Sequence, residues 1–293
     1  MCLKLAQLSE TIYYLRMNPI LRICFISCAF VFSALANAFP THQPVPGGTA
    51  VIKLTASNTP QPSAFFKKRK VAVHKHNDNW YALIGLSLNT KPGQYKISYQ
   101  LPNKKTQQLS FTVKDKTYKA QYLTIKNKRK VNPYAKDMDR IIKERKIKAA
   151  AKKTWSNQII HTDFIRPVEG RISSIFGLRR FFNNQARRPH SGLDIAAPEG
   201  TPIKAMADAR VIETGDFFFS GNMVYLDHGQ GVISLYAHMY KIHVTPGQLI
   251  KQGDIIGEVG ETGRVTGPHL HLSLLLNQTA VDPNHWLPAI KAP

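Results

Sequence analysis

The chain has 293 residues, of which 43% are apolar, and its 40 Lys and Arg against 18 Asp and Glu give a formal net charge of +22. The apolar fraction excludes a disordered chain, and the length leaves room for about two domains with cores of their own. All three cysteines, Cys2, Cys24 and Cys28, lie near the N-terminus. We therefore expect neither a disulfide framework nor a thiol nucleophile in the folded part.

The N-terminal segment has the pattern of a secretory signal. Two arginines precede an apolar run over 23–36, and Ala36-Asn37-Ala38 is a small-x-small cleavage site. The run is shorter than the ~20 residues that a membrane-spanning helix needs. We expect a cleavable signal peptide over 1–38, with Met1 or Met17 as the start, and no transmembrane helix after cleavage. An uncleaved anchor is the alternative, and it would leave the same domains outside the cytoplasmic membrane.

Short runs that alternate or are β-branched follow, separated by turn residues. They lie at 49–54, 71–76, 80–88, 94–101 and 108–113. Strands at this spacing predict a small antiparallel β-sandwich-like domain over 39–126.

A charged helical connector is expected next, over 127–160. Asn132 can cap a helix with Pro133 at its first position, and acid–base pairs at i,i+4 have the favourable orientation. The helical pattern ends near Lys153. The chain is therefore predicted to be mainly β, with one short basic helical segment between two β domains.

Positive charge is concentrated in the first two parts. Residues 39–113 carry a net charge of +9 and residues 114–153 carry +11, whereas 161–290 carry −1. An excess of positive charge suggests nucleic-acid binding in a cytosolic protein, but a secreted chain meets anionic envelope polymers first. We expect the basic half to bind such polymers and no nucleic acid. A solvated basic surface without a partner is the alternative.

The third part, 161–293, is again β, and the polar faces of its strands carry histidines. His269 and His271 are two residues apart in an alternating run, so both imidazoles lie on one face of a strand. His238 lies on the polar face of another strand. The predicted domain is an antiparallel β domain with an open groove.

A carboxylate lies four residues after another histidine in the stretch His190 to Asp194. Fully extended, the two residues would be ~13 Å apart, so a tight turn at Ser191-Gly192 is expected to bring them together. One carboxylate and two imidazoles form a donor set that zinc accepts, with a fourth position open to water. The pair His74 and His76 is a poor alternative metal site because lysines and arginines surround it.

Four stretches carry these residues in order. They are Arg187-Arg188-Pro189-His190-Ser191-Gly192-Leu193-Asp194-Ile195-Ala196, Gly221-Asn222-Met223-Val224, Tyr236-Ala237-His238-Met239 and Thr262-Gly263-Arg264-Val265-Thr266-Gly267-Pro268-His269-Leu270-His271. Together they resemble the sequential motifs of the lysostaphin/LytM-type zinc metallopeptidases, which cut peptide crosslinks in bacterial peptidoglycan. The front domain is similar to the small β domain that precedes the peptidase in some secreted members.

This resemblance implies roles for eight residues. His190, Asp194 and His271 would bind one zinc ion. His238 and His269 would be the catalytic histidines. Substrate-binding residues would be Asn222, Tyr236 and Arg264.

One departure from the family pattern is visible. Relatives often carry an aromatic residue and a Glu after the His-x-His, where this chain has Leu272 and Ser273. If that Glu braces the ligand histidine, Ser273 must do so more weakly or another group must replace it.

The resemblance implies a periplasmic or extracellular zinc metalloendopeptidase that hydrolyses peptide crosslinks or stem peptides of peptidoglycan. Two other functions fit parts of the sequence. A non-catalytic LytM-type regulator of cell-wall amidases would have lost zinc ligands, and this chain has not. A biotinyl or lipoyl carrier would use the turn pattern of 201–211 and 246–260, but secretion weighs against it.

Overall fold

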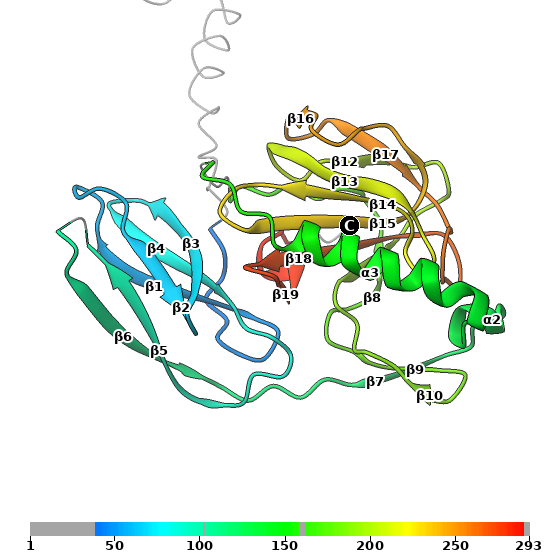
Figure 1. Cartoon of the computed structure of the whole chain (residues 1–293), viewed down its shortest axis with the longest axis horizontal. Helices are drawn as coiled ribbons and strands as arrows, with labels where there is room; N and C mark the ends of the chain where they lie inside the picture. Colours follow the sequence, from blue (N-terminus) through cyan, green and yellow to red (C-terminus); the bar gives the residue numbers. More distant parts are fainter. Residues whose placement is uncertain (1–38, 102, 159–161, 290–293) are drawn as a thin grey trace, which may run out of the picture. The chain divides into compact units, whose positions relative to one another are not determined.

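The computed structural model describes residues 39–101, 103–158 and 162–289 (Figure 1). The expected signal peptide with its cleavage site, and the three cysteines, lie outside the described residues. Across the described part of the chain, no helix has both the length and the apolar character needed to cross a membrane.

Six antiparallel strands form the front of the chain. They are β1 (Thr49–Ala56), β2 (Ser63–Phe66), β3 (Arg69–His76), β4 (Asn79–Gly85), β5 (Gly93–Gln100) and β6 (Thr106–Val113). Their order is β1-β4-β3-β2-β5-β6. Strand β3 pairs with β4 through 72–76 and with β2 through 69–71. It therefore belongs to both halves of the domain, one formed with β4 and β1 and the other with β2, β5 and β6. The inward side chains of the two halves form a single apolar cluster, as expected for a sandwich-like domain.

A ten-stranded antiparallel sheet forms the rear. Its main strands run in the order β16-β13-β14-β15-β18-β11-β8, β12 pairs with β17, and β17 and β19 attach to β15 and β18. The bounds are β8 Arg171–Ser174, β11 Leu193–Ala196, β12 Pro202–Lys204, β13 Ala209–Phe217, β14 Gly221–Asp227, β15 Val232–Ile242, β16 Leu249–Ile250, β17 Ile255–Val259, β18 His269–Leu276 and β19 Thr279–Val281. The prediction of a mainly β chain built from antiparallel sheets is confirmed.

A small third sheet connects the two. Strand β7 (Ala120–Leu123) pairs in parallel with β9 (Arg179–Phe182), and β10 (Gln185–Ala186) pairs with the other edge of β9. This sheet was not predicted, because a four-residue strand whose partner lies more than fifty residues later leaves no periodic pattern in the sequence.

The main helix of the connector starts later than expected. A short helix α2 (Lys128–Val131) and a 3₁₀ turn η2 (Ala135–Asp137) precede the main helix α3 (Met138–Lys152), and a second 3₁₀ turn, η3 (Pro283–His285), lies near the end of the chain. Asn132 has extended backbone and is the C-cap of α2 rather than the N-cap of a following helix, so the predicted start at Pro133 is wrong. The reason is the carboxylate of Asp137, which binds the Arg129 guanidinium and accepts from the Tyr134 N–H.

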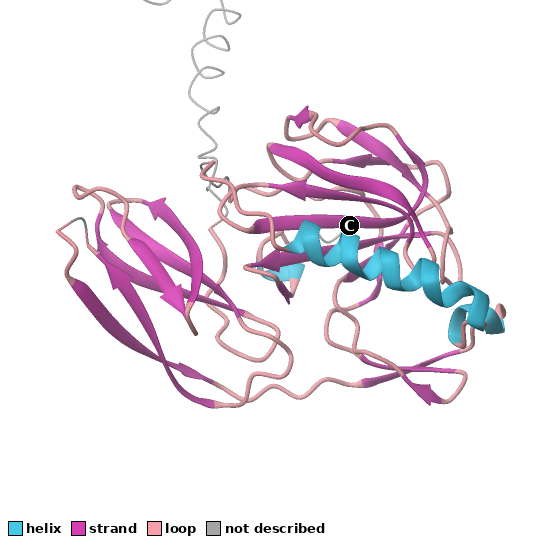
Figure 2. Ribbon diagram, viewed as in Figure 1, coloured by secondary structure: helices cyan, strands magenta, loops and turns pink. Residues whose placement is uncertain are grey.

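Helix α3 lies against β13 of the large sheet (Figure 2). The buried Glu144 carboxylate accepts hydrogen bonds of 2.9 Å from the Phe218 N–H and of 2.7 Å from Arg140. These contacts hold a basic helix against the sheet that carries the candidate site.

The front sheet and the rear sheet share apolar contacts. Ala72 and Leu83 of the front belong to the same buried cluster as the core of the rear domain. The indole N–H of Trp286 donates to the Thr49 hydroxyl at 3.1 Å, and a Cβ on Gly85 would lie 2.9 Å from Leu276. Residues near the two ends of the described chain are thereby joined.

Candidate metal centre

Three adjacent strands position the histidines. Asp194 of β11 lies opposite His271 of β18, and Ala237 of β15 lies opposite the same histidine on its other side. Alternation along β18 buries Leu270 and Leu272 completely, so His269 and His271 face the opposite side, as predicted.

His190, Asp194 and His271 converge on one point. His190 Nε2 lies 2.9 Å from Asp194 Oδ1 and 3.1 Å from His271 Nδ1, and the latter lies 2.7 Å from Asp194 Oδ1. Ligands at ~2.0 Å around a tetrahedral zinc ion would be ~3.3 Å apart, so the donor set fits this metal with a small expansion. Among the described residues, these are the His, Cys, Asp or Glu side chains whose ligand atoms lie close enough together to hold a metal ion.

A close backbone approach makes this convergence possible. The chain bends at Gly192, as expected from the sequence, and β11 starts at the next residue, Leu193. A Cβ on Gly192 would lie 2.6 Å from His271 Cε1, which is closer than real Cβ contacts come. Glycine is therefore required here for space.

Each of the three side chains has its second polar atom fixed by the protein. His190 Nδ1 contacts the Ile175 carbonyl at 2.7 Å, and His271 Nε2 contacts the Ser273 hydroxyl at 2.9 Å. The guanidinium of Arg180 donates to Asp194 Oδ2 at 2.6 Å. The atoms that remain, two ring nitrogens and one carboxylate oxygen, are those that converge. Such outer contacts fix the tautomer and orientation of metal ligands.

The protonation states suit metal binding. Burial lowers the pKa of His190 to about 4, despite the neighbouring Asp194 carboxylate, so the imidazole is neutral at pH 7. Burial alone would raise the pKa of Asp194, but its contacts with the His190 and His271 rings outweigh it and hold that pKa well below its usual range. Zinc binding requires neutral imidazoles and an ionised carboxylate, and His190 and Asp194 have these charge states.

His238 and His269 lie beside this cluster with their rings 4.9 Å apart. The Nδ1 of His238 contacts the Thr262 carbonyl at 2.7 Å, and that of His269 contacts the Gly267 carbonyl at 2.8 Å. A carbonyl can only accept, so Nδ1 carries the proton in both rings and each Nε2 is left as an acceptor. Burial first, and then the neighbouring imidazoles, lower the pKa of His238 to about 3. Burial also lowers the pKa of His269, so both rings are neutral at pH 7 and able to accept a proton at Nε2.

The backbone at His238 is left-handed, with φ of +65°. This conformation is uncommon for residues other than glycine, and such strained positions cluster at functional sites. It breaks the regular alternation of β15 at this residue, which is where the imidazole turns toward His269.

The three expected substrate-binding residues have different surroundings. Asn222 donates its side-chain amide to the Tyr240 carbonyl at 3.0 Å. Arg264 lies between the rings of Phe182 and Phe219, 4.6 Å from each centroid. Burial, followed by repulsion from nearby guanidinium groups, lowers its pKa to about 10.

Tyr236, by contrast, is a core residue. Its side chain is completely buried, and its hydroxyl accepts from the Met206 N–H at 3.1 Å. The expectation that Tyr236 contacts a substrate is therefore wrong. A motif match cannot distinguish a residue facing the groove from its neighbour facing the core, and Tyr236 is on the core face.

Sequence reasoning missed Arg180 and Ser174. Arg180 donates to the ligand carboxylate, and Ser174 lies 3.3 Å from His190 Nδ1. Arg180 lies in a run of two arginines with no spacing to any motif, so no signal marked it. The pair His74 and His76 is placed elsewhere, with the His76 ring stacked 4.0 Å from Phe39.

Comparison with known proteins identifies two family profiles in this chain. Residues 188–283 match Peptidase family M23, and residues 42–116 match the Peptidase family M23 N-terminal domain. The first range holds all three converging side chains and both neighbouring histidines.

Curated relatives match slightly less than two fifths of the chain. The DD-carboxypeptidase/endopeptidase Mpg of Neisseria meningitidis is 43% identical over 113 residues, which is 39% of this chain and 26% of the relative. The peptidoglycan DD-endopeptidase ShyA of Vibrio cholerae is 42% identical over 113 residues, 38% of this chain and 26% of the relative. The matched part thus spans about a quarter of the length of these proteins.

A solved structure from another bacterium also matches this chain over both β domains. The crystal structure of a Pseudomonas aeruginosa protein assigned to peptidase M23 is 38% identical, with a TM-score of 0.70. The match covers 83% of this chain and 95% of that chain. Both β domains are therefore shared with this neighbour.

Proposed function

The chain belongs to peptidase family M23, and on this basis we propose that it is a zinc metallopeptidase that hydrolyses peptide bonds of bacterial peptidoglycan. The observation that carries the proposal is the convergence of His190, Asp194 and His271, with two further neutral histidines beside them. Curated relatives named as peptidoglycan DD-endopeptidases support the substrate class.

His190 Nε2, Asp194 Oδ1 and His271 Nδ1 would hold the ion. Zinc bound there would polarise the scissile carbonyl and lower the pKa of a bound water toward ~7. The protein contributes the fixed geometry, because Ile175, Ser273 and Arg180 hold the second atom of each ligand. No ligand has to reorient before binding.

His238 and His269 are proposed to move protons. Each offers a free Nε2, and His269 Nε2 lies 3.9 Å from the ligand oxygen of Asp194. A neutral imidazole at this position can accept the proton of an attacking water and later donate one to the leaving amine. Asn222 and Arg264 are proposed to bind substrate in the groove beside these rings.

The cellular setting is also proposed. Peptidoglycan lies outside the cytoplasmic membrane, so the site would act in the periplasm or outside the cell, after export on the signal expected over 1–38. The basic front half and helix α3 are proposed to bind anionic envelope polymers. Exposed charges of one sign attract such polymers over about one Debye length, ~8 Å at physiological salt.

The non-catalytic alternative is a regulator that binds amidases. It is disfavoured because all five chemically required side chains are present and in register. Mature protein (39–293) should carry about one zinc ion and release peptides from purified peptidoglycan, as read by mass spectrometry of the digest.

His271→Ala should remove both the zinc and the activity. His243→Ala is the matched control, because that imidazole pairs with Glu258 at 2.9 Å outside the site and should keep both. A His271→Ala protein that retains full zinc would refute the ligand assignment. A wild-type protein that releases no peptide but stimulates an added amidase would favour the regulator.

A further inference from the structure

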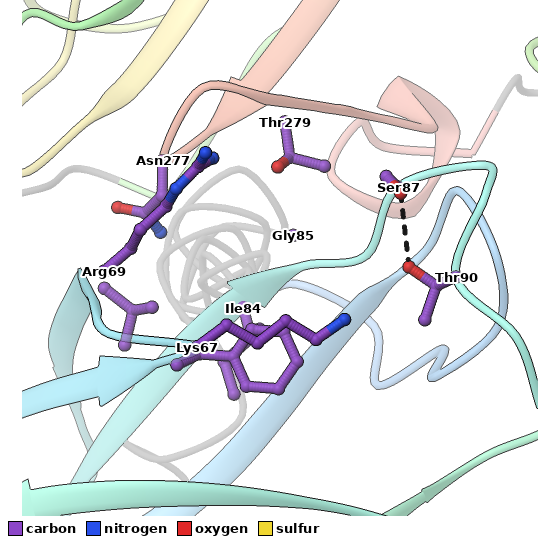
Figure 3. A pocket seen from close by; sticks show the side chains of 10 residues that line it. Lys67, Arg69, Ile84, Gly85, Ser87, Thr90, Asn277 and Thr279 are labelled. Carbon is purple, nitrogen blue, oxygen red and sulfur yellow. Dashed lines mark hydrogen bonds between the residues drawn. The ribbon is translucent and has the colours of Figure 1, made fainter. Parts of the chain in front are cut away.

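A cavity of about 300 Å³ lies between the front sheet and the hairpin formed by β18 and β19 (Figure 3). Its lining comes from β2, β3, β4 and the loop after β4 on one side, and from the hairpin on the other. The lining residues are Phe66, Lys67, Arg69, Val71, Ile84, Gly85, Ser87, Thr90, Asn277 and Thr279. None of them belongs to the metal centre.

The charged lining is entirely cationic. Lys67 and Arg69 are exposed, no carboxylate lines the cavity, and neither cation forms an ion pair within the described ranges. The Lys67 ammonium lies 4.9 Å from the Tyr95 ring centroid, which holds it near the cavity. Figure 3 shows Arg69 beside Asn277, whereas the Lys67 ammonium points toward Thr90. Lining cations without a counter-ion favour an anionic ligand.

The turn that presents Lys67 is unusual. Phe66 pairs with Arg69, so Lys67 and Lys68 form a two-residue turn with φ of +48° and +63°. Turns of this type strongly prefer Asn and Gly. Lysine at this position has no conformational advantage, which points to a use for its side chain.

Asn277 supplies an unsatisfied amide on the opposite wall. Both its Oδ1 and its Nδ2 are shielded from solvent, and neither has a hydrogen-bond partner among the described residues. The backbone at Asn277 has φ of +53°, which explains an Asn in this turn but not an amide buried without partners. A buried amide of this kind calls for a ligand with a donor and an acceptor side by side, as in a peptide group.

The rest of the lining suits small alkyl groups. Phe66, Val71 and Ile84 form an apolar surface, and the Ser87 and Thr90 hydroxyls contact each other at 3.3 Å. The volume is at the lower end of the ~300–1,000 Å³ typical of small-molecule sites. A phosphate ion would leave the apolar surface and the Asn277 amide unused.

We propose that this cavity binds a short peptide with small side chains through its free carboxylate, which pairs with Arg69 while the neighbouring Asn277 binds the adjoining peptide group. Because the walls belong to both sheets, the bound peptide would also hold the front sheet against the β18–β19 hairpin. The site does not depend on the metal centre.

The test is a titration of the zinc-loaded mature protein with acetyl-Ala-Ala. Binding is measured by calorimetry and by changes in amide chemical shifts. We expect a dissociation constant of about 1 mM or tighter, as is typical for a ligand of this size. The amide, acetyl-Ala-Ala-NH2, should bind at least about tenfold more weakly, because it loses charge-assisted hydrogen bonds. Equal affinity for acid and amide, no saturable binding, or equal binding of inorganic phosphate would overturn the proposal.

Variants locate the site. Arg69→Gln should weaken binding about tenfold, and Asn277→Asp, which tolerates the same backbone, should do so by placing a carboxylate against the ligand. Lys68→Gln, in the same turn but outside the lining, should have no effect. Melting temperatures identify any variant that fails to fold.

Two further variants separate this site from the groove. Binding should persist in His271→Ala, where no zinc can take up the carboxylate, and in Arg264→Gln. Loss of binding in either variant, with Arg69→Gln unaffected, would place the peptide in the peptidase groove and refute the cavity site. These binding measurements do not require peptidase activity, so their outcome is independent of the proposed function.

Discussion

Replacing Ser273 by Ala tests whether the contact behind a ligand histidine controls metal affinity. When Nδ1 of His271 binds the metal, the Nε2–H donates to the Ser273 hydroxyl at 2.9 Å. A neutral hydrogen bond of this kind contributes about 1 kcal/mol, which is a factor of about five in affinity. Ser273 is 4% exposed, so water cannot replace the lost partner without rearrangement. We expect zinc affinity to fall about five- to tenfold.

The assay is competition for zinc with a chelator of known affinity, with peptide hydrolysis measured at saturating zinc. Turnover at saturation should stay near the wild-type value, because the ligand atoms themselves are unchanged. Ser234→Ala is the matched control: its hydroxyl lies 2.7 Å from His228 Nε2 and is completely buried, but it is outside the metal centre. Unchanged zinc affinity in Ser273→Ala, or an equal loss in Ser234→Ala, would refute the reasoning.

Other expected outcomes follow from the same geometry. His238→Ala and His269→Ala should keep their zinc but lower kcat by about 10²-fold or more, the usual range for a general acid or base. Loss of zinc in either variant would show that the substituted histidine is a metal ligand. Gly192→Ala should reduce zinc content and melting temperature, because its Cβ would collide with His271; full zinc occupancy would contradict this. Binding of mature protein to whole peptidoglycan should weaken steeply as salt rises, whereas hydrolysis of a short peptide should change little; parallel salt curves would show that the basic half does not recruit substrate.

The strand pattern of the sequence predicted the metal-facing side chains well. Strict alternation around His269 and His271 determines which residues face the core, and burial of Leu270 and Leu272 confirms it. Gly192 signalled a bend rather than a helix. These features are local, so one strand or one turn is enough to predict them.

Features that depend on distant partners were not predicted. Arg180 reaches Asp194 only because β9 pairs in parallel with β7. The start of α3 depends on Arg129 and its partner carboxylate rather than on the capping residue preferred by local propensity. Burial of Tyr236 depends on the packing of several strands. Tertiary contacts override local preference in each case.

The hydrogen bond between Thr49 and Trp286 has a consequence for the order of folding. These residues are 237 positions apart, and Ala72 and Leu83 of the front sheet share a core with residues of the last strands. Contacts between such distant positions form slowly, because a long loop must close before they contribute. A chain that emerges from its N-terminus can pair β1 with β4 early, but it cannot bury the outer face of that sheet until β18 and β19 have emerged. That apolar face is the part of the molecule that stays open to aggregation for longest.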